Sequence, residues 1–161
     1  MTTAERKRIE PLTRTKLPTA VWSTAVPIRF RHCDPAGIVF TPRYFDILNE
    51  AVEQFFGAAL GLDYYLLISE RKIGLGYAQA SCEFLKPSRM GEVLDVAVLV
   101  ERIGGSSYTL VLPVFKDGVE VVRGRLVTVT TMLEAFTSRP IPDDIRAGLE
   151  GYRDRCGEAI A

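Results

Sequence analysis

Hydrophobic residues recur along residues 41–61 with the spacing of one long helix. They fall at i, i+1, i+4, i+7, i+8, i+11 and i+12, which gives one broad apolar stripe with most charged residues off it. Thr41 and Pro42 predict the helix start, and Gly57 and Gly61 are expected to end or weaken the helix. The stripe consists of Tyr44, Phe45, Leu48, Ala51, Val52, Phe55 and Phe56.

From residue 76 onward the hydrophobic period changes to two, which is typical of β-strands. Four strands are expected, at residues 76–86, 92–103, 107–116 and 119–133, with a tight hairpin turn at Asp117-Gly118. In the first run Ala78, Ala80, Cys82 and Phe84 share a face of mostly small side chains, which would let a helix lie close. An apolar helix and an antiparallel sheet able to bury it predict an α+β layer pair.

Weaker patterns predict a short strand at residues 26–30, a short helix at 64–70 and a terminal helix at 140–155. We expect one domain over residues 21–140, followed by a C-terminal helix or tail at 141–161. Residues 1–20 are basic and lack apolar periodicity, which predicts a mobile arm that either contacts a phosphate or stays solvated.

Composition narrows the possible partners. The 161 residues contain 20 basic and 20 acidic side chains, so no net field favours nucleic acid or an anionic membrane. No apolar run has the length of a membrane span, and the N-terminus lacks the apolar core of a secretory signal. Three cysteines without a CxxC pair, and one histidine, argue against a disulfide framework or a metal site. We therefore expect a cytoplasmic protein without a metal or redox cofactor.

The segment from Cys33 to Pro42 is the strongest candidate for chemistry. Asp34 lies on a loop that leads directly to the N–H groups of a helix start, and such groups suit a developing oxyanion. A carboxylate beside a thioester carbonyl can attack it or deprotonate a water. Equally, Asp34 could only close an Asx-type turn with Gly37 at positive φ. The residues alone leave both interpretations open.

The stretch HCDPAGIVFTPRYFDILNEA resembles the motif of the 4-hydroxybenzoyl-CoA thioesterase family of the hotdog superfamily, and EFLKPSRMGEVLDV resembles that family's second landmark. The similarity covers about residues 24–137. It implies the α+β hotdog fold, in which a five- to six-stranded antiparallel sheet wraps around a long central helix. It also implies a homo-oligomer with active sites at the dimer interface, commonly a tetramer. The implied reaction is hydrolysis of an aromatic acyl-CoA, with coenzyme A as part of the substrate and no other cofactor.

In this resemblance Asp34 is the catalytic carboxylate, and the oxyanion donor is a backbone N–H at Phe40 or Thr41. Two departures bear on the substrate. Asn49 stands where relatives specific for the 4-hydroxybenzoyl group carry an acid, so a benzoyl or another acyl group is equally expected. The stretch 104–107 lacks the basic cluster that some relatives use for the CoA phosphates. The candidate donors are then Lys86, Arg89, Arg102 and the N-terminal arm.

The remaining candidates have two interpretations each. His32 would tune the pKa of Asp34 from the same side of an extended strand, or would serve as a hydrogen-bonded structural residue. Glu50 and Glu53, on the polar side of the helix, would face solvent or an interface, or would be alternative catalytic carboxylates, since some hotdog thioesterases use a helix glutamate. Three aromatic residues would line an acyl pocket or simply pack: Tyr44, Phe45 and Tyr77.

Two other functions fit the same residues. One is a hotdog acyl-CoA hydratase or dehydratase, although the chain has no histidine after His32 to complete the usual aspartate–histidine pair. The other is a non-catalytic acyl-CoA-binding module or structural subunit.

Overall fold

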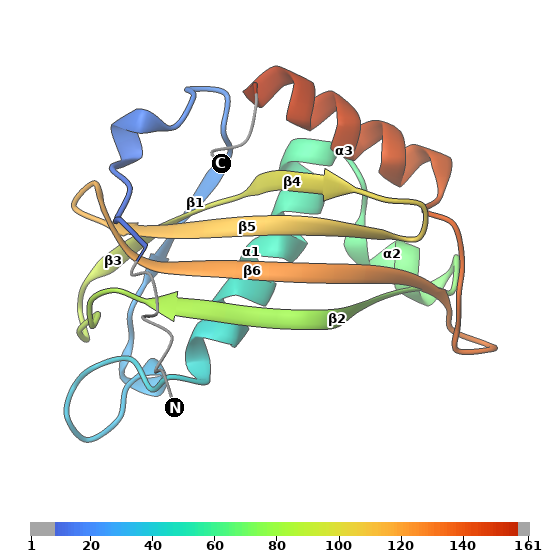
Figure 1. Ribbon diagram of the computed structural model, residues 1–161. Coiled ribbons are helices and arrows are strands. Elements are labelled where there is room, and N and C mark those ends of the chain that lie inside the picture. The colour runs from blue at the N-terminus through green and yellow to red at the C-terminus, as the bar shows by residue number, and fades with distance from the viewer. Residues whose placement is uncertain (1–8, 158–161) are drawn as a thin grey trace, which may run out of the picture.

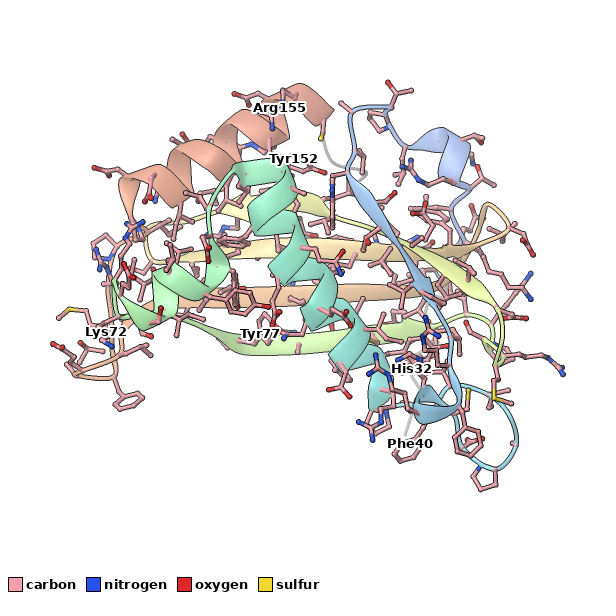
Figure 2. The ribbon with its side chains drawn as sticks, turned by 180° about the vertical axis from the view of Figure 1, so that it is seen from behind. His32, Phe40, Lys72, Tyr77, Tyr152 and Arg155 are labelled. Carbon is pink, nitrogen blue, oxygen red and sulfur yellow. The ribbon has the colours of Figure 1, made fainter. Side chains whose placement is uncertain are left out.

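The apolar stripe expected in residues 41–61 forms α1 (Arg43–Leu60), which lies across one face of an antiparallel sheet (Figures 1 and 2). This computed structural model describes residues 9–157. The other elements are η1 (Arg14–Lys16), β1 (Ser23–Pro27), η2 (Phe30–His32), α2 (Tyr64–Ser69), β2 (Ile73–Phe84), β3 (Val93–Ala97), β4 (Leu99–Ile103), β5 (Ser107–Lys116), β6 (Val119–Met132), β7 (Thr137–Ser138) and α3 (Asp143–Cys156). The expected hotdog arrangement is confirmed.

Within residues 9–157 the sheet has seven strands instead of the five to six expected, because the run at 92–103 forms two strands and the short β7 is added. Its main order is β1-β3-β5-β6-β2, with β4 beside β5 and β7 beside β6. The run expected at residues 92–103 is divided into β3 and β4 at Val98. There the backbone changes partners, because the Val98 N–H donates to Trp22 O and Val98 O accepts the Tyr152 hydroxyl. The expected hairpin between β5 and β6 is confirmed, with Asp117 and Gly118 both at positive φ.

The start of α1 differs from the expectation by one residue. Pro42 occupies the N-cap position, and this cap has no side-chain hydrogen bond among the described residues. At the other end the helix passes through Gly57 and stops at Gly61, whose φ of 68° is the left-handed conformation that terminates many helices.

The stripe itself needs two corrections. Phe45 lies at its margin and is 36% exposed, whereas Ile47, outside the predicted stripe, is 1% exposed.

Helix α1 touches the sheet over a glycine of β6. A Cβ at Gly124 would lie 2.5 Å from Cδ1 of Leu48, a fully buried residue of α1. The expectation that Ala78 and Ala80 support this contact is wrong, because both are exposed. They belong to β2, an edge strand whose only pairing partner within residues 9–157 is β6. The close approach therefore depends on Gly124.

The described part of the N-terminal arm, residues 9–20, packs against the β5–β6 hairpin rather than extending into solvent. The carboxylate of Glu120, whose side chain is completely buried, accepts the Leu12 N–H at 2.8 Å and two N–H groups of Arg123 at 2.7 and 2.6 Å. Leu17 adds apolar burial. Residues 1–8, which carry Arg6, Lys7 and Arg8, lie outside the described part of the chain.

Helix α3 covers one margin of the sheet, as Figure 1 shows. Its Tyr152 ring packs edge-on against Phe55 of α1, with 4.8 Å between ring centroids. No helix within residues 9–157 has the length and apolar character needed to cross a membrane.

Candidate active site

Residues 32–40 form a narrow loop closed at its neck by backbone hydrogen bonds. The Phe40 N–H donates to His32 O at 2.9 Å, and the Asp34 N–H donates to Ile38 O at 3.0 Å. Gly37 has a φ of 76° and donates to Asp34 O at 2.9 Å, which completes the turn. This closure holds Asp34 in one position relative to the start of α1.

The loop is attached to the segment between β2 and β3. The Val39 N–H donates to Ser88 O at 2.9 Å, and the Met90 N–H donates to Gly37 O at 3.1 Å. The two sequence landmarks, residues 32–51 and 83–96, are thus one structural unit.

Glu92 stabilises the second landmark from within. Its carboxylate accepts the Arg89 N–H at 2.8 Å and forms an ion pair with Lys116. Burial opposes ionisation, yet these hydrogen bonds and the charge of Lys116 lower the pKa of Glu92 below its usual value. The turn that supports the Asp34 loop therefore contains a stabilised carboxylate.

The Asp34 side chain is partly exposed and closes an Asx turn, as one of the two interpretations predicts. Its Oδ1 accepts the Ala36 N–H at 2.8 Å. Among residues 9–157, Oδ2 accepts no hydrogen bond. One carboxylate oxygen thus fixes the orientation of the group, and the other remains available to a substrate or a water.

The two predicted oxyanion donors differ. The Phe40 N–H is already used by His32 O, whereas the Thr41 N–H has no acceptor among the described residues. Pro42 has no N–H, and the next N–H, that of Arg43, donates to Phe40 O at 2.8 Å. Thr41 is therefore the position at this helix start where an N–H can donate to an anionic oxygen.

A hollow of about 240 Å³ lies beside Thr41. The rings of Tyr44 and Phe84 pack at 5.5 Å within its wall, and Lys86 lies at its rim. Tyr44 is buried against Ser88, and this burial raises the pKa of the Tyr44 phenol. The hollow can receive an apolar group next to the Thr41 N–H.

His32 is a buried structural residue at the neck of the loop. Its Nδ1 accepts the Arg29 N–H at 2.9 Å, and its Nε2 lies 3.3 Å from the Arg31 Nε–H. Burial, and secondly the nearby Arg31 guanidinium, lower the pKa of His32 below 6.5. The expectation that His32 and Asp34 share one side of an extended strand is wrong, because β1 ends at Pro27 and His32 belongs to the 3₁₀ helix η2.

Asn49 and Tyr77 meet farther along α1, in the direction of its C-terminus. The Tyr77 hydroxyl donates to Asn49 Oδ1 at 2.8 Å, and Asn49 Nδ2 donates to Glu53 Oε1 at 3.3 Å. Tyr65 of α2 donates its hydroxyl to Glu53 Oε2 at 2.9 Å. Figure 2 shows Tyr77 in the middle of β2, away from His32 and Phe40 at the start of the helix.

The other candidates are spread over the surface. Glu50 shares a separate hollow of about 290 Å³ with Arg31 and Arg43, beside η2. Of the three proposed phosphate donors, Lys86 lies at the rim of the Tyr44–Phe84 hollow, and Arg89 forms a backbone bridge with Ile38.

Arg102 lies on β4, and two strands, β5 and β6, separate β4 from the β2 edge. The structure therefore does not bring it to Lys86 and Arg89 within one chain.

Three contributors to this region were absent from the sequence prediction: Phe84, Ser88 and Tyr65. Ser88 and Phe84 both lie within the second landmark, so docking that landmark onto the Asp34 loop would have indicated both. Tyr65 had no signal, because its contact with Glu53 depends on how α2 folds back on α1.

The antiparallel sheet around α1, with an aspartate loop at the helix start, defines a hotdog-fold protein. The chain matches the model of the thioesterase-like superfamily over residues 28–149 and belongs to that family. A 1,4-dihydroxy-2-naphthoyl-CoA hydrolase of Nostoc punctiforme is 25% identical over 128 residues, which are 78% of this chain and 84% of that protein.

Solved structures are similar over most of the chain. A thioesterase superfamily protein from Jannaschia sp. CCS1 has a TM-score of 0.77 at 25% identity, covering 84% of this chain and 94% of its own. A gentisyl-coenzyme A thioesterase has a TM-score of 0.72 at 26% identity, covering 80% of this chain and 99% of its own.

Proposed function

We propose that this protein is an acyl-CoA thioesterase that hydrolyses an aromatic acyl-CoA to the free acid and coenzyme A. The observation that carries the proposal is that one loop and the helix start that follows it present two unsatisfied groups: Asp34 Oδ2 accepts no hydrogen bond within residues 9–157, and the Thr41 N–H has no acceptor there. Relatives named for naphthoyl-CoA and gentisyl-CoA hydrolysis support an aromatic acyl group.

The reaction follows from these two groups. The thioester oxygen accepts the Thr41 N–H, which stabilises the negative charge that develops on that oxygen. Asp34 attacks the carbonyl carbon or takes a proton from the attacking water. The carbon–sulfur bond then breaks, and coenzyme A leaves as the thiolate. With attack by Asp34, water hydrolyses the resulting anhydride and regenerates the carboxylate. In the general-base route, the proton that Asp34 took from water passes to the departing thiolate, which also regenerates the carboxylate.

We also propose that the chain acts as a homodimer joined at the β2 edges, and that two dimers form a tetramer. Along β2, residues 76–81 are all exposed, and an unpaired strand edge offers its backbone groups to another chain. A second β2 there would also cover Tyr77, which is 37% exposed. Light scattering after size exclusion should give two or four times the chain mass of 17.9 kDa. A monomer would refute the assembly.

The decisive test of the reaction is free-thiol release from benzoyl-, 4-hydroxybenzoyl-, phenylacetyl- and aliphatic CoA esters. Asp34→Asn should reduce kcat by about 100-fold or more, since a positioned acid–base group contributes about 10²–10⁴-fold. The asparagine oxygen can still accept the Ala36 N–H, so the loop should keep its shape. Asp46→Asn, which removes an exposed carboxylate from α1, is the matched control. Unchanged turnover in Asp34→Asn would exclude the assigned role.

The same panel separates the rival functions. Binding of a CoA ester without thiol release would identify a non-catalytic binding module. Addition of water to an enoyl-CoA would identify a hydratase.

A further inference from the structure

Exposed apolar side chains gather beside the Asp34 loop. Phe30 is 83% exposed, Phe40 is 51% exposed and Met90 is 50% exposed. Figure 2 shows Phe40 at the same end of the molecule as His32. A single exposed apolar residue needs no explanation, but a group of them marks a surface that binds a partner.

Backbone hydrogen bonds hold the segments that carry these side chains in one rigid unit. The Gly91 N–H donates to Ile28 O at 2.8 Å, which joins the turn before β3 to the residues that lead into η2. The Met90 N–H donates to Gly37 O at 3.1 Å, which joins the same turn to the Asp34 loop. A preformed surface loses little conformational entropy when it binds a partner.

Basic side chains lie among the apolar ones. Arg29, Arg31 and Arg89 are exposed, and within residues 9–157 none of the three forms an ion pair. Elsewhere on the surface arginines are paired, as Arg71 is with an aspartate and Arg125 with a glutamate. The three cations beside the Asp34 loop are therefore available to an anionic partner.

Nearby acidic side chains do not cancel this charge. Glu92 and Asp46 each form an ion pair of their own, and Glu50 shares its hollow with Arg31 and Arg43. The whole chain has equal numbers of basic and acidic side chains, so this end of the molecule is positive relative to the rest. A positive patch favours a partner whose surface is acidic.

The arrangement suits a protein better than the nucleotide of coenzyme A. A nucleotide concentrates its phosphates in a small volume, whereas here the cations alternate with apolar side chains. Arg29, Phe30 and Arg31 are consecutive, and Arg89 precedes Met90. Arginine, methionine and aromatic residues are the types enriched in protein–protein interfaces. A membrane against the same residues would cover the Asp34 loop, so a protein partner is favoured.

These side chains lie away from the proposed dimer contact. Arg29 and Phe30 come shortly after β1, and β1 and β2 are the two ends of the main strand order. A dimer joined at the β2 edges pairs the opposite margin of the sheet and leaves Arg29 and Phe30 accessible.

We propose that this surface docks an acidic acyl carrier protein, whose phosphopantetheine arm brings an acyl thioester to Asp34. The docking surface consists of Arg29, Phe30, Arg31, Arg89 and Met90. This inference rests on the proposed thioesterase function and extends its substrates from acyl-CoA to carrier-bound esters. Water supplies the hydroxyl group of the free acid, the carbon–sulfur bond breaks, and the thiol stays on the arm of the carrier.

The test compares kcat/KM for a benzoyl group carried on three thiols: a bacterial fatty-acid acyl carrier protein, pantetheine and coenzyme A. The wild type should use the carrier ester about tenfold better than the pantetheine ester at about 50 mM salt. This preference should shrink at about 300 mM salt, because salt screens interactions between exposed charges.

Two substitutions test the docking surface directly. Arg29→Glu and Phe30→Ser should each lower kcat/KM for the carrier ester about fivefold or more, mainly through KM, and should change that for the pantetheine ester less than about twofold. Phe30→Leu keeps an apolar side chain and should retain most of the carrier preference. Arg153→Glu is the matched control, because it reverses a charge on α3, which Figure 1 shows far from the Asp34 loop.

Several results would overturn the inference. Equal use of the carrier and pantetheine esters by the wild type is one. A second is a carrier preference that Arg29→Glu and Phe30→Ser both keep, which would place docking elsewhere. Equal losses for both esters would indicate a folding defect instead. Binding to phosphatidylglycerol vesicles that both variants abolish, without a carrier preference, would assign the surface to a membrane.

A binding measurement separates docking from the reaction. Titration of the protein with a fluorescently labelled carrier that bears the free phosphopantetheine arm measures docking without turnover. If no ester releases thiol but the carrier binds in an Arg29-dependent way, the proposed reaction fails and the docking surface stands. If CoA esters are hydrolysed but the carrier does not bind, the docking surface fails and the reaction stands.

Discussion

A methyl group added at Gly124 should destabilise the protein by forcing Leu48 away from the sheet. The new Cβ would lie 2.5 Å from Cδ1, 3.4 Å from Cδ2 and 3.5 Å from Cγ of that side chain. Leu48 is fully buried, so it has no empty space to move into. Overpacking of this kind costs about 1–3 kcal/mol. For a chain of this size each kcal/mol corresponds to about 2–4 °C in Tm.

A double-mutant cycle makes the reasoning specific. Leu48→Ala alone should cost about 2–5 kcal/mol through the cavity that it creates. The Gly124→Ala methyl should partly fill that cavity, so the double variant should be more stable than the sum of the single effects predicts by about 1 kcal/mol or more. Gly57→Ala is the control, because its added methyl meets nothing within 4 Å. That variant should be stabilised by up to about 1 kcal/mol.

Urea unfolding at fixed protein concentration measures these effects. The single tryptophan, Trp22, packs 5.9 Å from the Phe55 ring of α1, so its fluorescence reports on helix docking. Independent sites have additive effects on stability to within about 0.5 kcal/mol. Additive losses in the double variant would therefore refute the close contact between α1 and β6. A loss below about 0.5 kcal/mol in Gly124→Ala would refute it as well.

Other predictions concern buried or titrating groups. Glu120→Ala should cost about 3 kcal/mol, because it leaves Arg123 without its buried partner, and it should expose the N-terminal arm to proteolysis. If Glu120→Ala lowers stability but the arm is not cleaved faster, the predicted role of Glu120 in holding the arm is wrong. Since the pKa of His32 is lowered below 6.5, the unfolded chain binds the proton more readily, so stability should fall as pH decreases below 6.5. NMR titration of this single histidine should give a midpoint below 6.5, and a midpoint above it would contradict the burial. Lys86→Ala should raise KM several-fold for CoA esters but not for pantetheine esters, because its position at the rim suits a phosphate contact. An equal rise for both substrate types would exclude that contact.

Much of the fold follows from local chemistry in the chain. The 3.6-residue period of α1, the two-residue period of the strands and the turn at Asp117-Gly118 are local signals, and each marks an observed element. The division at Val98 is not local, because it depends on the Tyr152 hydroxyl supplied by α3. The edge position of β2 is equally non-local, and this is why small side chains at Ala78 and Ala80 indicated the wrong helix contact.

The candidate site divides in the same way. Asp34 and the helix start lie within one short motif, so their proximity could be predicted. The sequence could not predict which backbone N–H groups of this segment are hydrogen-bonded. In the structure the Phe40 N–H donates to His32 O, whereas the Thr41 N–H has no acceptor among the described residues. Nor could the sequence place Tyr77 against Asn49, because twenty-eight residues and a change of secondary structure separate them.

The glycine under Leu48 has a consequence for how the protein can change over evolution. Helix α1 begins just after Thr41 and carries Asn49 and Glu53 farther along one rigid rod, and that rod rests on β6 at Gly124. A substitution that tilts the rod there would move both ends together. New acyl preferences should therefore arise more readily by exchanging side chains along the helix than by repacking beneath it.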